Sequence, residues 1–286
     1  MDVIINKIHQ LTPSIRAFEL VSSSGSALPR FEAGSHIDVH LKNGLTRQYS
    51  LSNCSSENHR YVIGVLHDEN SRGGSRCIHN DYQKGDVLSI GQPRNLFALH
   101  GNTKKAVLFA GGIGITPILS MAYCLKAQNI PFELHYFVRS HEMIAFYGNL
   151  TQHFAEQIHF HIQNQVDTEC NMANVLQQPD SSKHLYVCGP TGFMQFVMQS
   201  AETAGWQSEQ LHQEHFVAQQ SKQENDEAFT LEIAGTGQRI EIHSEQTVTQ
   251  ALLAHGFDVP VSCEQGICGT CITRVVSGVP DHRDVF

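Results

Sequence analysis

The chain has 286 residues, a length that suits two or three domains better than one hydrophobic core. Hydrophobic residues make up 41% and charged residues 16% of the sequence, which is an ordinary globular composition. The formal net charge of −9 argues against nucleic acid as a ligand, because nucleic-acid binding relies on basic patches. The same charge is compatible with docking on a basic protein surface.

The first ten residues, MDVIINKIHQ, lack the basic start and apolar core of a signal peptide. Residues 106–125 carry no charge and are long enough to span a bilayer. Three glycines and Pro117 fall within this window, however, and would break a lone spanning helix. We therefore expect a strand, a glycine turn and a helix here, no membrane contact, and a cytoplasmic protein.

Residues 1 to about 100 consist mainly of short strands between turns. An alternating segment at 36–41 is followed by YVIGVL at 61–66 and by DVLSI at 86–90, which comes after the turn QKGD. Few helical stretches intervene. This pattern predicts an antiparallel β-barrel.

From about residue 104 to 210 the hydrophobic period changes, and strands alternate with helices. Strands are predicted at 106–110, 132–138, 158–162 and 185–189, and helices at 117–128, 141–154 and 190–205. The alternation indicates a parallel α/β domain.

The remainder begins with a polar segment, AQQSKQENDE at 218–227, which is typical of an interdomain linker. Beyond it, FTLEIAG and QRIEIHS flank a GTG turn and predict a β-hairpin. Residues 244–256 predict a helix with Ser244 as its N-cap and Gly256 as its stop. Residues 272–278 predict a strand and a turn.

Three cysteines, Cys263, Cys268 and Cys271, have C-x4-C-x2-C spacing in CEQGICGTC. This spacing is typical of plant-type [2Fe–2S] sites, which take a fourth cysteine further along the chain. Gly266 and Gly269 would let backbone N–H groups approach the sulfur atoms. The alternatives are a chance cluster or a zinc site, and zinc usually takes a second CxxC pair that this sequence lacks.

Two glycine-containing loops follow strands of the predicted parallel sheet. GGIGITP at 111–117 lies where backbone N–H groups and a helix N-terminus can approach a diphosphate. It departs from the GxGxxG pattern, and a plain tight turn between strand and helix is the alternative. CGP at 188–190 ends a later strand, so both loops should face one crevice at the carboxyl ends of the strands.

Two motifs in the predicted barrel are suited to a flavin. RQYSL at 47–51 offers an arginine, a tyrosine and a serine on one strand, and SRGGS at 71–75 offers a glycine nest for a phosphate. Taken singly, each is better explained as a charged edge strand or a glycine turn.

The sequence contains 18 histidines, which raises the question of a metal site. His159 and His161 share one face of the strand predicted at 158–162. His36 and His40 share a face of another predicted strand, but no third ligand is evident there. We expect packed or solvated imidazoles in both places.

Taken in order, these motifs resemble those of the phthalate dioxygenase reductase family, within the ferredoxin–NADP reductase superfamily. The resemblance extends over essentially the whole chain and includes RQYSL, SRGGSR, PRNLF, GGIGITPILSM, YFVRS, CGPTGFM, LHQEHF and CEQGICGTC with RVVSGVPDHRD after it. The most similar patterns are those of the reductase components of vanillate demethylase and carnitine monooxygenase systems.

The resemblance implies an NAD(P)H-dependent flavoprotein oxidoreductase. In such a protein, electrons pass from NADH through FMN to a [2Fe–2S] cluster and on to a Rieske-type terminal oxygenase; NADPH is possible in place of NADH. The implied domains are a flavin-binding β-barrel at 1–102, an NAD-binding α/β domain at 103–217, a linker at 218–227 and a β-grasp ferredoxin-like domain at 228–286.

The resemblance also assigns residues to each cofactor. The flavin ring and ribityl chain are held by residues of one strand, Arg47, Tyr49 and Ser50. The flavin phosphate is held by the glycine nest, Arg72, Gly73, Gly74 and Ser75. The nicotinamide nucleotide is bound by residues that follow the parallel strands, Gly111, Gly112, Gly114, Pro117, Arg139, Ser140, Cys188, Gly189, Pro190, Phe193 and Met194. Of these, Arg139 and Ser140 would contact the adenosine half.

Three residues, Thr116, Cys188 and Phe216, are implied to lie near the place of hydride transfer, with Glu214 beside Phe216. No residue is required as a general acid or base, because hydride transfer depends on proximity and alignment. The cluster ligands are implied to be the three cysteines of the C-terminal loop.

The sequence departs from the family pattern near its end. The family places its fourth cysteine on a final strand, roughly thirty residues beyond the third, and no cysteine follows Cys271. We therefore expect a ferredoxin-like domain without its final strand and without its fourth ligand. The simpler explanation is a shortened chain whose cysteines are the remnant of a complete site, and the alternative is a fourth ligand from a partner or a histidine.

Two other functions stay open on the sequence alone. One is a stand-alone NAD(P)H:flavin or acceptor reductase, and the other is a cofactor-poor binding or redox-sensing scaffold with a zinc or empty cysteine site. A flavin absorption band that NADH bleaches would favour an enzyme, whereas a colourless protein with bound zinc would favour the scaffold.

Overall fold

The computed structural model describes residues 1–69, 71–216, 227–263, 266–281 and 283–284. The chain forms two compact units, Met1–His215 and Phe216–Phe286. The boundary predicted near residue 102 falls inside the first unit. The linker predicted at 218–227 lies outside the described residues except for its last residue.

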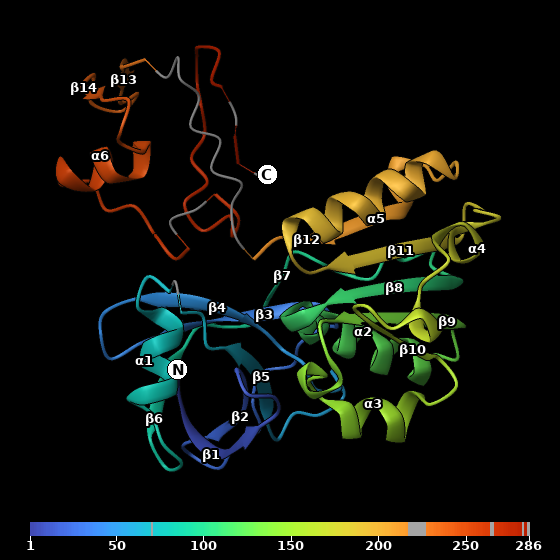
Figure 1. The fold of residues 1–286 in the computed structure, drawn as a ribbon. Coiled ribbons are helices and arrows are strands. Elements are labelled where there is room, and N and C mark those ends of the chain that lie inside the picture. The colour runs from blue at the N-terminus through green and yellow to red at the C-terminus, as the bar shows by residue number, and fades with distance from the viewer. Residues whose placement is uncertain (70, 217–226, 264–265, 282, 285–286) are drawn as a thin grey trace. The chain divides into compact units, whose positions relative to one another are not determined.

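The N-terminal half of the first unit is an antiparallel sheet of seven strands (Figure 1). The strands are β1 (Asp2–Gln10), β2 (Ile15–Ser22), β3 (Ser35–His40), β4 (Thr46–Ser50), β5 (Tyr61–Leu66), β6 (Val87–Ile90) and β7 (Arg94–Asn95). Their order is β4-β3-β6-β1-β2-β5, with β7 paired to β3. A bridge between Leu51 and Ile63 joins the two ends of this order, so the sheet closes into the predicted barrel.

Alternation of buried and exposed residues explains why these segments form a closed sheet. In β6, for example, Leu88 and Ile90 are buried whereas Val87 and Ser89 are exposed. The buried side chains of five strands, β1, β2, β3, β5 and β6, form one core inside the barrel. The helix α1 (Gly74–Asn80) was not predicted from the sequence, because it is short and begins at a glycine pair; its Ile78 packs into the same core.

The C-terminal half of the first unit is a parallel sheet with the order β10-β9-β8-β11-β12. Its strands are β8 (Lys105–Gly111), β9 (Phe132–Val138), β10 (Ile158–Ile162), β11 (Lys183–Cys188) and β12 (Leu211–Glu214). All of its strand pairs are parallel. The inner strands are buried on both faces, which is why they read as continuous apolar runs.

Helices cover both faces of the parallel sheet (Figure 1). The α-helices are α2 (Ile115–Ala127), α3 (Tyr147–Phe154), α4 (Met172–Leu176) and α5 (Thr191–Thr203), and the 3₁₀ turns are η1 (Gly112–Gly114), η2 (His141–Met143), η3 (Val166–Thr168) and η4 (Ser208–Gln210). Residues of α2 and α3 share a core with Leu108 and Tyr136. Residues of α4 and α5 pack against Val107 and Phe109, which point to the opposite face.

Within the described residues, no helix combines the length and the apolar character needed to cross a membrane.

The helix predicted at 141–154 is wrong in its first half. The structure has the turn η2, then extended residues, and α3 begins only at Tyr147. Phe146 has a φ of +56°, a left-handed conformation that interrupts a helix. Ala145 and Phe146 are buried in the core that α2 and α3 share with Leu108 and Tyr136. This burial stabilises the break, although the sequence of 141–154 has the amphipathic pattern of a helix.

The second unit contains a hairpin and a helix: β13 (Phe229–Glu232), β14 (Arg239–Ile242) and α6 (Val248–Ala254). Ile240 and Ile242 form a small core with residues of α6. The predicted N-cap Ser244 is wrong, because the side chain of Thr247 accepts the hydrogen bond from Gln250 N–H. Residues 272–278 form no strand, and Val276 is exposed.

Candidate functional site

The two glycine loops predicted to face one crevice lie against each other. A Cβ atom on Gly114 would lie 2.2 Å from the carbonyl oxygen of Cys188, and one on Gly189 would lie 3.0 Å from Gly111 Cα. The ring of Phe193, in α5, closes over both loops and would be 2.9 Å from a Cβ at Gly111 or Gly189. Only glycine allows this approach, which brings the ends of β8 and β11 together.

A buried tyrosine fixes the first glycine loop. The Tyr136 hydroxyl donates a hydrogen bond to the carbonyl oxygen of Gly112 at 3.0 Å and accepts one from Ala145 N–H at 3.3 Å. The Thr116 hydroxyl donates to the Ile113 carbonyl oxygen at 3.0 Å. Sequence reasoning missed Tyr136, and its only signal was a polar hydroxyl within the apolar strand at 132–138.

On the barrel side, two of the predicted flavin motifs meet. Gly73 has a φ of +97° and precedes α1, whose first residue is Gly74. A Cβ atom on Gly74 would lie 2.7 Å from Cγ of Arg47, so β4 and the glycine nest are in contact. Ser75 Oγ accepts a hydrogen bond from Asp68 N–H at 3.2 Å, which holds the loop that contains Arg72.

The barrel and the parallel sheet meet beside the glycine loops. Gly64 of β5 packs on Thr116, because a Cβ atom there would lie 2.7 Å from Thr116 Cγ2. The Ser120 hydroxyl of α2 donates to the carbonyl oxygen of Asn53 at 3.1 Å. These contacts place the first half of α2, which follows β8 and η1, against β5 and the loop after β4.

Ser50 and Glu214 form a contact across this junction. Ser50 ends β4, Glu214 ends β12, and the serine hydroxyl donates a hydrogen bond to Glu214 Oε2 at 3.4 Å. Although Glu214 keeps some exposed surface, protein atoms crowd its carboxyl group, and this loss of hydration raises its pKa to about 8. The carboxyl group is therefore largely protonated at neutral pH.

Cys188 lies at the end of β11 and is fully buried. Burial raises the pKa of its thiol, and the nearby Glu214 carboxyl raises it further. Cys188 is therefore a neutral thiol in this structure rather than a thiolate nucleophile.

The other predicted nucleotide residues lie around the same strand ends. Arg139 and Ser140 follow β9, and Arg139 is exposed. Pro190 precedes α5 and would contact a Cβ at Gly111. Met194 is buried in the core beneath α5 and Pro117 lies in the first turn of α2, so the structure gives these two a packing role. Phe216 belongs to the second unit and is 38% exposed.

The residues at this junction fit a flavin and a nicotinamide nucleotide. Arg47, Tyr49 and Ser50 offer charged and polar groups on β4, and the glycine nest adjoins them. Gly112, between β8 and α2, has no atom within 4 Å of a Cβ position, so its backbone is open to a diphosphate beside the N-terminus of α2. All of these residues belong to the first unit, where the barrel meets the parallel sheet.

The cysteine loop lies in the second unit. Cys263 and Cys268 are buried, and Cys271 is half-buried. Gly266 and Gly269 have φ values of +70° and +65°. Thr270 N–H donates a hydrogen bond to Cys268 Sγ at 3.5 Å. The pKa of Cys268 is lowered mainly by its contact with Cys263 and to a smaller extent by its hydrogen bonds with Thr270. Two buried sulfur atoms, the lowered pKa of Cys268 and the backbone donor at Thr270 fit an iron–sulfur cluster.

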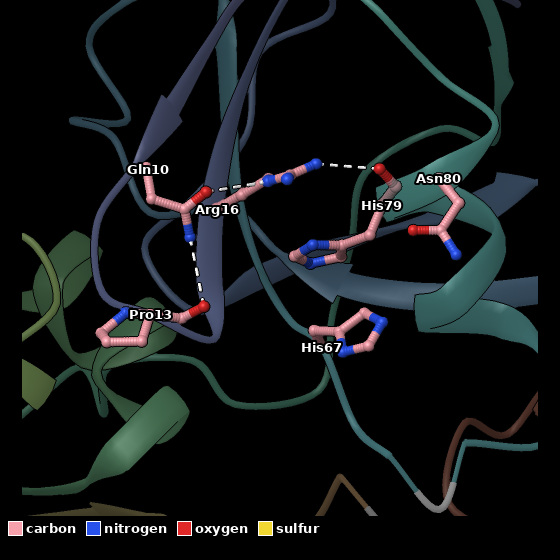
Figure 2. Close-up of a pocket in the computed structure, with 6 residues that line it drawn as sticks. All are labelled: Gln10, Pro13, Arg16, His67, His79 and Asn80. Carbon is pink, nitrogen blue, oxygen red and sulfur yellow. Dashed lines mark hydrogen bonds between the residues drawn. The ribbon is translucent and has the colours of Figure 1, made fainter.

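A separate polar pocket of about 270 Å³ lies on the barrel, and none of its lining residues is one predicted for a cofactor (Figure 2). Its lining residues are Gln10, Pro13, Arg16, His67, His79 and Asn80. Arg16 already donates to Gln10 Oε1 at 3.0 Å and to the His79 carbonyl oxygen at 2.8 Å. The protein itself therefore uses two nitrogens of the only arginine in this pocket, and we do not assign it to the site.

Comparison with known proteins places this geometry in context. The 2Fe-2S iron-sulfur cluster binding domain family matches residues 231–285. Vanillate O-demethylase oxidoreductase of Acinetobacter baylyi is 78% identical over 286 residues, which cover 100% of this chain and 90% of that protein. The phthalate 4,5-dioxygenase oxygenase reductase subunit of Pseudomonas putida is 39% identical, over 96% of this chain and 86% of that protein.

A solved structure of phthalate dioxygenase reductase aligns with a TM-score of 0.79 and 36% identity, over 100% of this chain and 89% of that chain. It is described as a modular structure for electron transfer from pyridine nucleotides to [2Fe–2S]. The likeness confirms the predicted fold class of barrel, parallel sheet and ferredoxin-like domain. Its extent, with the identities above, shows that the chain belongs to the phthalate dioxygenase reductase family of oxidoreductases.

Proposed function

We propose that this chain is the reductase subunit of an oxygenase system, which passes electrons from NADH through FMN and a [2Fe–2S] cluster to a Rieske-type terminal oxygenase. The observation that carries the proposal is the junction in the first unit, where the glycine loops, β4 and Glu214 converge. The buried cysteine loop of the second unit adds the group that a one-electron acceptor needs. We place this activity in the cytoplasm, as predicted from the sequence.

When bound, a flavin would supply a hydride acceptor that can give up its two electrons singly, and an iron–sulfur cluster would supply a one-electron carrier. The residues of the chain bind and align these groups. Arg47, Tyr49 and Ser50 would hold the flavin ring and ribityl chain, with Arg72 to Ser75 at its phosphate. The loops at 111–117 and 188–190 would hold the nucleotide, with Arg139 and Ser140 at its adenosine half.

The Ser50–Glu214 contact has a defined task in this scheme. A carboxyl group with a pKa of about 8 keeps its proton at neutral pH, so it adds no negative charge beside the bound nucleotide. Its hydrogen bond to Ser50 ties β4 to β12. We infer that this hydrogen bond fixes the barrel against the parallel sheet at the site and that Glu214 holds a proton there.

The terminal oxygenase that best fits the similarity is one that demethylates vanillate. The support is the 78% identity to a vanillate O-demethylase oxidoreductase, together with 48% identity to two further proteins of that name from Pseudomonas. In that reaction the methyl ether, O₂, NADH and a proton give the phenol, formaldehyde, water and NAD⁺. The reductase then supplies the two electrons that balance the step.

An absorption spectrum before and after anaerobic NADH, with iron and sulfide assayed on the same sample, tests the cofactor assignment. A flavin band that NADH bleaches is the expected result, and about two irons per chain on the same sample would show that the three cysteines find a fourth ligand. A bleached flavin band without iron would mean a working flavin half beside an empty cysteine loop. A colourless protein with zinc would overturn the proposal in favour of the scaffold.

Reconstitution with purified oxygenases tests the partner. We expect NADH consumption coupled to formaldehyde release with a vanillate-demethylating oxygenase, and far weaker coupling with a phthalate-oxidising one. Equal rates with both, or uncoupled NADH oxidation, would show that the partner assignment is wrong while leaving the cofactor assignment intact.

A further inference from the structure

A group of titratable side chains lies on the parallel sheet outside the proposed electron-transfer site. His135 of β9 pairs in register with His159 of β10, and their ring centroids are 4.9 Å apart. His161 follows on the same face, and Glu133 precedes His135 on the same face of β9. Phe109, which belongs to the core beneath α4 and α5, stacks on His135.

The hydrogen bonds assign the protons of two of these rings. His161 Nδ1 lies 2.6 Å from the carbonyl oxygen of Thr168, and because a carbonyl can only accept, this nitrogen carries the proton. A neutral His161 then has its lone pair on Nε2, which lies 3.0 Å from His135 Nδ1. His135 must therefore donate from Nδ1, and its own lone pair is on Nε2.

The lone pair of His135 has no donor. His135 is 3% exposed, and its Nε2 is a buried atom without a hydrogen-bond partner among the described residues. Glu133 Oε2 lies 3.7 Å from His135 Nε2, which is beyond hydrogen-bond distance. With the protons so assigned, two acceptors face each other across this gap, an arrangement that a cation would satisfy.

We propose that Glu133, His135 and His159 form a binding site for a divalent transition-metal ion, of which zinc is the best match. Each residue offers one ligand atom, and these atoms all lie within 4.8 Å of one another. Two imidazoles and one carboxylate suit zinc rather than calcium or magnesium, which take oxygen ligands. Three protein ligands leave a fourth position for water.

The surroundings prepare these groups for a metal. A glutamate side chain is a carboxylate at neutral pH, and the Lys105 ammonium beside Glu133 favours that ionised form. Lys105 contacts the other carboxylate oxygen, Oε1, at 3.5 Å, which leaves Oε2 facing His135. A neutral imidazole at His159 keeps one ring nitrogen as an acceptor, which is the form that binds a metal.

The site also has an outer shell and an entrance. The chain from His135 Nδ1–H to His161, and from His161 to the Thr168 carbonyl, is the kind of support that fixes a metal-binding histidine. His159 is exposed, and Glu133 lines a polar pocket of about 240 Å³ that opens beside α4. A hydrated ion therefore reaches the ligands from solvent.

A neighbouring group, His135, His161 and Cys170, satisfies the same distance criterion. It would use Nδ1 of His135, which already donates its proton to His161. Burial raises the pKa of Cys170 to about 11, so its sulfur is a thiol rather than the thiolate that binds metals. A neutral His135 has a single lone pair and cannot bind a metal ion in both groups at once. The Glu133 group is therefore the favoured site.

Zinc titration of the full-length holoprotein, followed by calorimetry and by the zinc retained after dialysis, tests the proposal. We expect one site that is lost in His159→Gln and Glu133→Gln. The outer-shell variant His161→Gln should retain the site with affinity about 10–100-fold weaker. The matched controls are His9→Gln, an exposed strand histidine elsewhere, and Cys170→Ser; both should bind zinc as the wild type does.

Zinc held by the cysteine loop does not confuse this comparison, because it would survive in His159→Gln. Equal binding by the wild type and by His159→Gln would overturn the proposal and leave Glu133 and His135 as an ordinary ion pair. Loss of zinc in Cys170→Ser with retention in His159→Gln would also overturn it, in favour of the neighbouring group.

Discussion

At the scale of single residues, the approach of Gly114 to Cys188 decides whether the two glycine loops can meet. A Cβ atom on Gly114 would overlap a backbone carbonyl oxygen at the end of β11. Moving a side chain cannot relieve this overlap, because the atom in the way is part of the backbone. Gly192, in the first turn of α5, has no atom within 4 Å of such a Cβ. These two glycines lie near the same site and differ only in the room around them.

Gly114→Ala should therefore destabilise the first unit by about 1–3 kcal/mol, because backbone must shift to relieve the overlap. Gly192→Ala should be neutral or stabilise it by up to about 1 kcal/mol through helix propensity. Urea unfolding followed by the fluorescence of Trp206, the single tryptophan and a buried residue of this unit, measures both. Equal stability of the two variants would show that the loops are not in the close contact described.

Glu214 predicts a pH dependence of stability. Its pKa is raised in the folded state, from the usual 4.5 to about 8, so the folded protein keeps a proton that the unfolded chain releases. Its contribution is complete below the unfolded pKa and is lost as pH rises through the window from 4.5 to about 8. Glu214→Gln should remove this loss, since the amide does not titrate.

Unfolding midpoints at about pH 5.5 and about pH 8.5 provide the comparison. The wild type should lose more stability between these two values than Glu214→Gln does. A parallel decline in both proteins would mean that the Glu214 carboxyl is already ionised at the lower pH.

At the scale of elements, strands were easier to locate from sequence than helix ends. The predicted strands 61–66, 132–138 and 158–162 coincide with β5, β9 and β10, because their alternation or continuous burial leaves little choice of boundary. Helix ends depend on a few local hydrogen bonds. The cap of α6 is three residues later than predicted, since Thr247 and Gln250 form a reciprocal capping box.

Thr247→Ala should therefore raise amide hydrogen exchange in α6 by about fivefold, which corresponds to a cap worth about 1 kcal/mol. Ser244→Ala is the matched control, because Ser244 is exposed and lies outside the helix. It should leave exchange in α6 unchanged. A larger effect of Ser244→Ala would restore the cap that the sequence suggested.

At the scale of the whole molecule, the chain divides into two compact units, and the proposed functions divide with them. The residues proposed for flavin and nucleotide lie in the first unit, apart from Phe216, and the cysteine loop lies in the second. Damage to one group of residues should therefore leave the chemistry of the other intact.

Cys268→Ser should abolish the cluster absorption and the electron supply to an oxygenase, while NADH still bleaches the flavin at the wild-type rate. Cys124→Ser, in α2 of the first unit, is the control that should keep both activities. Loss of flavin reduction in Cys268→Ser would mean that the two units do not function separately.

The sequence by itself determined the order of motifs, the change from barrel to parallel sheet, and the family, because hydrophobic period and glycine and cysteine spacing are local properties of the chain. Tertiary structure decided what depends on partners far apart in sequence. Ser50 and Glu214 meet across 164 residues. Glu133 and His135 complete a group with His159 only because β10 pairs beside β9. No local pattern encodes these contacts, since sheet order and burial, which set both proximity and pKa, arise only when the whole unit packs.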